Sequence, residues 1–416
     1  MDLSICGRLA DARGYLGEGC VNVREGLITS VSKGPEAYEV HWFNEDGTVI
    51  VPGFIDLHVH LRGLDLSYKE DEESGTRAAL SSGVTLVVDM PNTRPRLSTP
   101  AAVKMKLDAL QNRSYTDYGV YAGVPDDPDL LDELARLPVA GFKVYPEDMA
   151  ARPQSVSRVL SSGRLVVVHP ELPEAERLGY DENDRRAAER GCWMEGASLG
   201  YLLSLGSPRR LHVTHASCPT TIDLARSQGA TTDVTPHHLL YDATRHGCQF
   251  RVNPPLRDSA TRDLLVKYVL EGLVDAIASD HAPHSPQEKA SWPHCPPGIP
   301  WLGLWPLALY RLVSSGALPL SDFLRLTSLG PARVLGLDGL YGLILPGYRA
   351  NLVAINTGWR GRFTWAYSKA PYWHAFMEDV YAAPSAVFVG GALAALEGKP
   401  LLRPPVRNPF EVAGRG

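Results

Sequence analysis

Between residues 50 and 335 the chain alternates short apolar runs with longer segments of helical pattern. The runs are rich in β-branched residues and have the length of strands. Eight strands that alternate with helices predict a parallel sheet, and eight is the number that closes a barrel. The runs end near His60, Asp89, Ala122, Tyr145, His169, His215, Thr235 and Asp280, and the clearest helices are expected at 68–82, 99–112, 194–205 and 259–273.

The two ends of the chain follow a different pattern. Short alternating stretches at 20–23, 27–31, 351–355 and 386–389 are interrupted by glycine. Such stretches are typical of antiparallel hairpins, and we expect the two ends to pair. The predicted fold class is therefore α/β, a (β/α)8 TIM-type barrel over 53–341 with a small β-sandwich domain formed by residues 1–52 and 342–416.

Composition narrows the function classes. A chain of 416 residues with 44% apolar residues can bury a large core. Its net charge of −6 disfavours a nucleic-acid partner or an anionic membrane surface, and neither a membrane span nor a secretory signal is recognisable. The six cysteines have no paired spacing, so we expect free thiols in a reducing cytoplasm.

The sharpest local motif is a His-x-His pair at the end of the first predicted barrel strand. Residues two apart in a strand face the same side, so His58 and His60 direct both imidazoles to one point. Two imidazoles at the top of a strand suit a catalytic zinc site. The alternative is a pair of packed core histidines.

Four further polar residues end other predicted strands, where barrel enzymes carry their catalytic groups. They are Lys143, His169, His215 and Asp280. Lys143 follows an apolar run, which should not bury a bare ammonium. A buried amine can add carbon dioxide to form a carbamate, and the two carbamate oxygens can each hold one metal. Two metals with a bridging hydroxide would polarise a substrate carbonyl, while Asp280 transfers the proton.

At these residues the chain resembles the amidohydrolase superfamily and, within it, the dihydroorotases. The resemblance runs from the Gly53 region through the barrel and to residues 346–352. It implies two zinc ions and hydrolysis of L-dihydroorotate to N-carbamoyl-L-aspartate in pyrimidine synthesis. It also implies the metal ligands His58, His60, carbamylated Lys143 and Asp280 for one ion, and the Lys143 carbamate with His169 and His215 for the other.

The resemblance also implies a set of substrate contacts. Arg62 matches the arginine that binds the substrate carboxylate, and its planar fork suits a carboxylate. Hydantoinases and dihydropyrimidinases lack this arginine. Pro297 and Gly298 match the loop that reads the amide edge of the ring. The remaining matches are Asn92 and His284, as further carboxylate contacts, and Asn253.

Three readings stay open. Many bacterial dihydroorotases carry an Asp where this chain has Lys143. A Lys here resembles the dihydroorotase domain of the animal multifunctional pyrimidine protein and the hydantoinases, so an allantoinase or hydantoinase is the alternative. After Lys143 the mobile-loop motif of the animal enzyme is missing, and a separate alternative is that Glu147 or Asp148, which stand there, approach the metals instead. The third reading is a non-catalytic scaffold subunit. A homodimer and an association with aspartate transcarbamoylase are the partners left open.

Overall fold

In the computed structural model, the described residues are 2–178, 183–290, 294–362, 367–370 and 379–413. Eight parallel strands in chain order form one sheet, and a bridge between Val59 and His281 joins its two edges. This arrangement confirms the predicted barrel. The barrel strands are β6 (Phe54–Val59), β7 (Val84–Asp89), β8 (Asp117–Gly123), β9 (Gly141–Val144), β10 (Leu165–Val168), β11 (Arg210–Val213), β12 (Thr231–Val234) and β13 (Ala276–Ile277).

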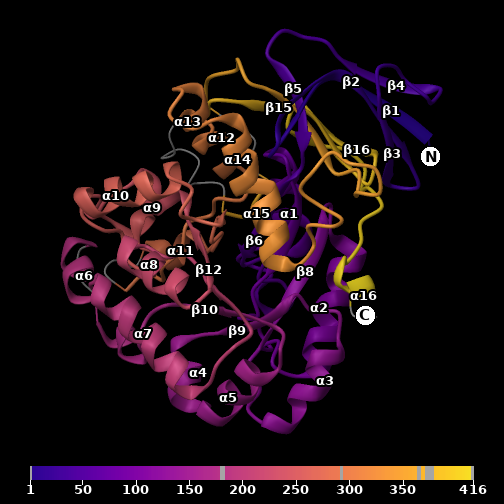
Figure 1. The fold of residues 1–416 in the computed structure, drawn as a ribbon. Coiled ribbons are helices and arrows are strands. Elements are labelled where there is room, and N and C mark those ends of the chain that lie inside the picture. The colour runs from indigo at the N-terminus through magenta and orange to yellow at the C-terminus, as the bar shows by residue number, and fades with distance from the viewer. Residues whose placement is uncertain (1, 179–182, 291–293, 363–366, 371–378, 414–416) are drawn as a thin grey trace.

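Helices surround the barrel (Figure 1). The four helices predicted from periodicity are present, at α1 (Glu72–Ser81), α2 (Pro100–Arg113), α7 (Cys192–Leu205) and α10 (Ser259–Leu270). The start of α1 is later than expected because Asp71 caps it, accepting the Ser74 backbone N–H at 2.8 Å. The other helices are α3 (Leu131–Arg136), α4 (Pro146–Ala151), α5 (Pro153–Ser161), α6 (Asn183–Glu189), α8 (Pro219–Ser227), α9 (Pro236–Leu240), α11 (Pro286–Lys289), α12 (Trp305–Leu309), α13 (Arg311–Ser314), α14 (Leu320–Leu324), α15 (Gly330–Leu335) and α16 (Phe410–Ala413).

A second, nine-stranded sheet combines the two ends of the chain, which lie side by side in Figure 1. The link is β5, whose residues pair with β14 in antiparallel register and whose Ile50 pairs with Leu9 of β1. The strands are β1 (Asp2–Asp11), β2 (Gly14–Arg24), β3 (Leu27–Ser32), β4 (Glu39–Phe43), β5 (Thr48–Pro52), β14 (Leu352–Asn356), β15 (Ala383–Val389), β16 (Ala392–Leu396) and β17 (Lys399–Pro400).

The prediction of free thiols is wrong, because all six cysteines form disulfides. The pairs are 14, 26 and 47 residues apart in sequence, so their spacing gives no sign of pairing. The fold brings each pair within 6.0 Å between Cα atoms, which is bonding range. The bonds are Cys6–Cys20, Cys192–Cys218 and Cys248–Cys295.

Among the described residues, no helix is both long enough and apolar enough to cross a bilayer.

Candidate active site

A cavity of about 270 Å³ opens at the carboxyl ends of the barrel strands. Because parallel strands end on the same side of a barrel, side chains that are distant in sequence meet there. With the exception of Lys143, every residue predicted for the site lines this cavity. These residues are His58, His60, Arg62, Asn92, His169, His215, Asn253, Asp280, His284, Pro297 and Gly298.

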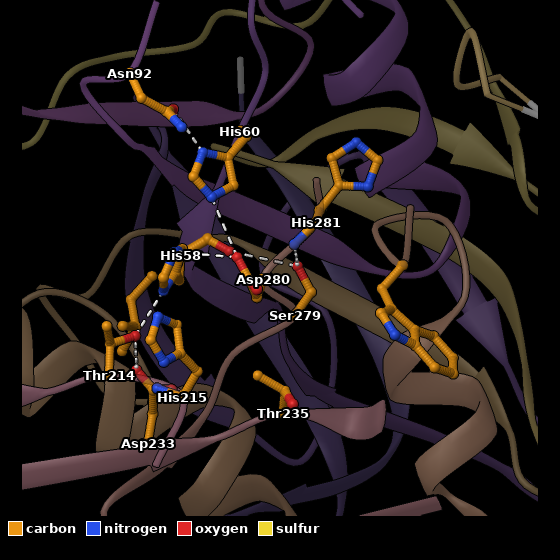
Figure 2. Close-up of polar contacts among 12 residues, drawn as sticks. His58, His60, Asn92, Thr214, His215, Asp233, Thr235, Ser279, Asp280 and His281 are labelled. Atoms are coloured by element: carbon orange, nitrogen blue, oxygen red, sulfur yellow. Dashed lines mark hydrogen bonds and ion pairs between the residues drawn. The ribbon is translucent and has the colours of Figure 1, made fainter. Parts of the chain in front are cut away.

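The closest grouping of ligand atoms joins the first strand to the last. His58 Nε2 and His60 Nε2 lie 3.2 and 3.1 Å from the same carboxylate oxygen, Oδ1 of Asp280 (Figure 2). The three side chains offer ligand atoms within 4.8 Å of one another, and all three are buried. Two imidazole nitrogens and a carboxylate oxygen at this spacing are a donor set that zinc accepts.

Neighbouring polar groups set the tautomer of each histidine. Thr214 Oγ1 donates its hydrogen to Asp233 at 2.8 Å, so the 2.6 Å contact with His58 Nδ1 requires His58 to donate. His60 Nδ1 lies 2.7 Å from Oδ1 of Asn92, and it can likewise donate there. Both histidines then keep a lone pair on Nε2, the nitrogen that faces Asp280 (Figure 2). This is the tautomer that a metal ligand needs.

Lys143 lies near the end of β9, has no exposed surface and does not line the cavity. Its Nζ has no hydrogen-bond partner among the described residues and lies 5.2 Å from the ring centre of Tyr145. Burial lowers the pKa of this amine to about 7, which makes the neutral, nucleophilic form accessible. Burial lowers the pKa of His58 and of His215, and the Lys143 charge contributes to both shifts.

The histidines that end β10 and β11 form the other half of the site. The rings of His169 and His215 lie edge to face, 4.5 Å apart, and His215 is 5.2 Å from His58. His169 Nε2 lies 2.8 Å from a carboxylate oxygen of Glu171, so it can donate there and leave Nδ1 as the free ligand atom. Glu171 in turn is held by a buried ion pair with Arg190.

Three predicted site residues have left-handed backbone conformations, which side chains rarely adopt. The φ angles are 56° at Arg62, 41° at His215 and 46° at Asp280. Such conformations cost about 1–3 kcal/mol each and persist where the surroundings enforce them. They turn the chain sharply at the tops of the strands and direct these side chains into the cavity.

Cationic side chains gather around His284 at the cavity. Arg62 is 6% exposed, and its Nη2 lies 3.3 Å from His284. His284 accepts a hydrogen bond from Lys69 and donates to the Pro297 carbonyl oxygen. Burial and the charges of Arg62, Lys289 and Lys69 lower the pKa of His284 well below its ordinary value. A neutral histidine and a buried arginine make this a site for an anion.

The loop that carries Arg62 rests on a second buried lysine. Lys106 Nζ donates to the Arg62 carbonyl oxygen at 3.0 Å and pairs with Glu72 and Asp89 at 2.7 and 2.9 Å. The two carboxylates outweigh burial and raise the pKa of Lys106. Lys106 is therefore a fully charged structural lysine, in contrast to Lys143.

The sequence analysis did not predict some of the residues that line the cavity, among them Tyr145, Glu171 and Arg190. Tyr145 and Glu171 each stand two positions after a predicted ligand, so they could have been found from strand alternation. Arg190 follows α6 and has no such signal. Of the two acidic residues after Lys143, Glu147 lines the cavity. Asp148 does not line it and instead forms ion pairs with Arg96 at 2.8 Å and with Arg152 at 3.1 Å.

Comparisons with known proteins agree with this geometry. The model of the amidohydrolase family matches residues 49–150 and 189–393. A dihydroorotase of Aeropyrum pernix is 47% identical over 305 residues, which cover 70% of each chain. A dihydroorotase of Saccharolobus solfataricus is 38% identical over 368 residues, or 88% of each chain.

Solved structures of similar fold are more distant in sequence. L-hydantoinase from Arthrobacter aurescens has a TM-score of 0.87 at 23% identity, covering 97% of this chain and 98% of its own. D-hydantoinase from a Thermus species has a TM-score of 0.85 at 23% identity and covers 96% of each chain. At this identity the likeness establishes the fold.

Proposed function

The chain belongs to the amidohydrolase family, and we propose that it acts there as a dihydroorotase, hydrolysing L-dihydroorotate reversibly to N-carbamoyl-L-aspartate in pyrimidine synthesis. The main support for this substrate is Arg62, a buried guanidinium that faces the cavity next to neutral His284. Dihydroorotate carries a carboxylate on its ring, and the uncharged rings of hydantoin and dihydrouracil do not. A buried arginine without an anion would be a costly feature in an enzyme for uncharged rings.

The metals belong to the proposal. His58, His60 and Asp280 would hold one zinc ion, and His169 and His215 the other, with a carbamate on Lys143 between them. The Nζ of Lys143 has no hydrogen-bond partner in the described ranges, and this supports the carbamate. Reaction with carbon dioxide would replace the unpaired amine with an anionic group whose two oxygens suit metal cations. When bound, two zinc ions supply an acidified water and polarise a carbonyl.

Residues of this chain would bind the substrate and transfer the proton. Arg62, with Asn92 and His284, would hold the ring carboxylate, and Pro297 and Gly298 would face the amide edge. Hydrolysis adds a water oxygen to the ring carbonyl carbon and breaks its bond to nitrogen. Asp280 accepts the proton that the water loses and delivers it to the leaving nitrogen, so the carboxylate is regenerated in each cycle.

A substrate panel tests the proposal. Purified protein would be assayed with dihydroorotate, hydantoin, dihydrouracil and allantoin, and its metal content measured. We expect turnover of dihydroorotate far above the uncharged rings, with two zinc ions per chain. Preference for an uncharged ring would replace this proposal with a hydantoinase or allantoinase, and a metal-free, inactive protein would support the scaffold reading.

Location and assembly stay predictions. The chain contains three disulfides, which are rare in most cytoplasmic proteins. Intracellular proteins of hyperthermophilic archaea do retain disulfides, so a cytoplasmic location agrees with these bonds if the chain comes from such an organism. A homodimer and an association with aspartate transcarbamoylase are tested by light scattering of the chain alone and mixed with that enzyme.

A further inference from the structure

Asn253 lines the cavity on the segment between η4 (Cys248–Phe250) and α10. Its side-chain amide has one end that accepts a hydrogen bond and one that donates. The end that faces the cavity therefore decides which substrate group Asn253 can bind. A neighbour outside the cavity makes this choice.

That neighbour is Arg186, on α6, which is 1% exposed. Its Nη2 donates to the side-chain oxygen of Asn253 at 2.5 Å and to the Val252 carbonyl oxygen at 3.1 Å. A guanidinium has donors and no acceptor, so the end of the amide facing it must be the oxygen. Asn253 is left with its NH2 group for the cavity.

The surroundings of Arg186 make this orientation firm. Arg186 Nε and Nη1 have no hydrogen-bond partner within the described ranges. Burial, together with the charges of Arg190 and Arg251, lowers the pKa of Arg186 to about 9. Because the Arg186 guanidinium has so few acceptors, the hydrogen bond to the Asn253 oxygen is needed. Rotating the Asn253 amide by 180° would place its NH2 group against the Arg186 N–H, and both are donors.

We propose that Arg186 is a positioning residue that fixes Asn253 as a hydrogen-bond donor to a carbonyl oxygen of the substrate ring. The inference rests on the proposed function for the identity of the ring. It explains why a buried cation stands behind the cavity without lining it: Arg186 acts through Asn253. It also predicts that a carboxylate at position 253 would keep Arg186 in place and still impair binding.

A double-mutant cycle tests this inference. Arg186→Met, Asn253→Ala and the double variant would be compared in KM and kcat for dihydroorotate. We expect Arg186→Met to raise KM about tenfold, the worth of one substrate hydrogen bond, with kcat little changed. In the Asn253→Ala background the same change should add nothing, because the two residues act as one unit. Arg185→Met, at the exposed neighbouring position on α6, is the matched control and should behave as wild type.

Asn253→Asp is the second variant. It offers Arg186 an oxygen and an ion pair, so folding is kept, but it has no donor for the ring. We expect a stable protein with a raised KM. An unchanged KM in Asn253→Asp, or an equal effect of Arg186→Met with and without Asn253, would overturn the inference. If wild-type protein fails to turn over dihydroorotate, the proposed function has failed instead.

Discussion

The two ends of the barrel both bury charged side chains, but they compensate those charges differently. At the carboxyl end, the Lys143 amine has no hydrogen-bond partner within the part of the chain that the structure describes, and the same holds for Tyr145 Oη and His215 Nδ1. At the amino end, the Asp117 carboxylate at the start of β8 accepts five hydrogen bonds. Both Lys143 and Asp117 are fully buried.

The partners of Asp117 come mainly from the terminal part of the chain. Arg349 binds it through two nitrogens at 3.0 and 3.1 Å, and Asn351 and Tyr341 donate at 3.0 Å each. The Arg407 backbone N–H completes the set at 2.9 Å. One carboxylate therefore ties the segment after the barrel to the barrel floor.

The contrast shows how to separate a stabilising polar cluster from a functional one. A buried group that folding alone must support is surrounded by partners, since an unmade hydrogen bond costs about 1–3 kcal/mol. A buried group left without partners lowers stability and persists where something else binds it. Substitutions at the two ends should accordingly separate activity from stability.

The largest effect is expected at the carboxyl end, from Lys143→Met. The variant loses the predicted bridging ligand, so activity on dihydroorotate should fall about 10³-fold or more, with loss of bound zinc. Stability of the metal-free protein should not fall, because an apolar side chain replaces an amine without partners. Metal analysis and thermal unfolding in chelator measure the two outcomes. Retained zinc with full activity would remove Lys143 from the site.

The opposite result is expected from Asp117→Ala at the amino end. Removal of the carboxylate leaves Arg349 buried and unpaired, which should cost about 3–5 kcal/mol of unfolding free energy. Zinc content and KM at low temperature should stay as in wild type, because Asp117 is remote from the cavity lining. Asp129→Ala is the control, since its ion pair with Arg158 is exposed and worth at most about 1 kcal/mol. Equal destabilisation by the two variants would undo the contrast between the ends.

A smaller effect on activity is expected from Arg62→Met. Hydrogen bonds to a charged group contribute about 1.5–3 kcal/mol, so kcat/KM for dihydroorotate should fall about 10- to 150-fold. Zinc should remain, because among the described residues the Arg62 side chain contacts Pro283 and His284, and neither is a proposed metal ligand. A loss of zinc together with activity would show that Arg62 supports the metal half of the cavity.

The sequence predicted the features that depend on local order. Strand ends at His60, Asp89 and His215 fall within two residues of the observed ones, because apolar runs and alternation are local properties. The same property located His60 and Asp280, which the barrel brings together although they lie 220 residues apart in sequence. Directly after the run that ends at Thr235, residues 236–240 form α9, with Thr235 as its cap and Pro236 at its first turn.

Features that depend on distant contacts could not be predicted. Arg186 reaches Asn253 from 67 residues away, and Arg190 reaches Glu171 from a helix end with no motif. The disulfides belong to the same class, since each bond joins elements whose approach only the fold determines. These contacts orient the side chain of Asn253, which the sequence had indicated, and that of Glu171, which it had not.

The smallest effect is expected far from both ends, from Cys6→Ser combined with Cys20→Ser. The two cysteines face each other across β1 and β2, and the bond closes a loop of 14 residues. The loop entropy limits its contribution to about 3 kcal/mol, and the β1–β2 ladder already holds the strands together. We therefore expect a modest fall in the midpoint of thermal unfolding, with zinc content, kcat and KM unchanged, because neither cysteine lines the cavity. The same comparison with and without reductant serves as the control: wild type should lose stability on reduction, and the variant should lose less. A fall in activity at unchanged stability would mean that the terminal sheet influences the site, and the division between a stabilising and a catalytic region would need to be redrawn.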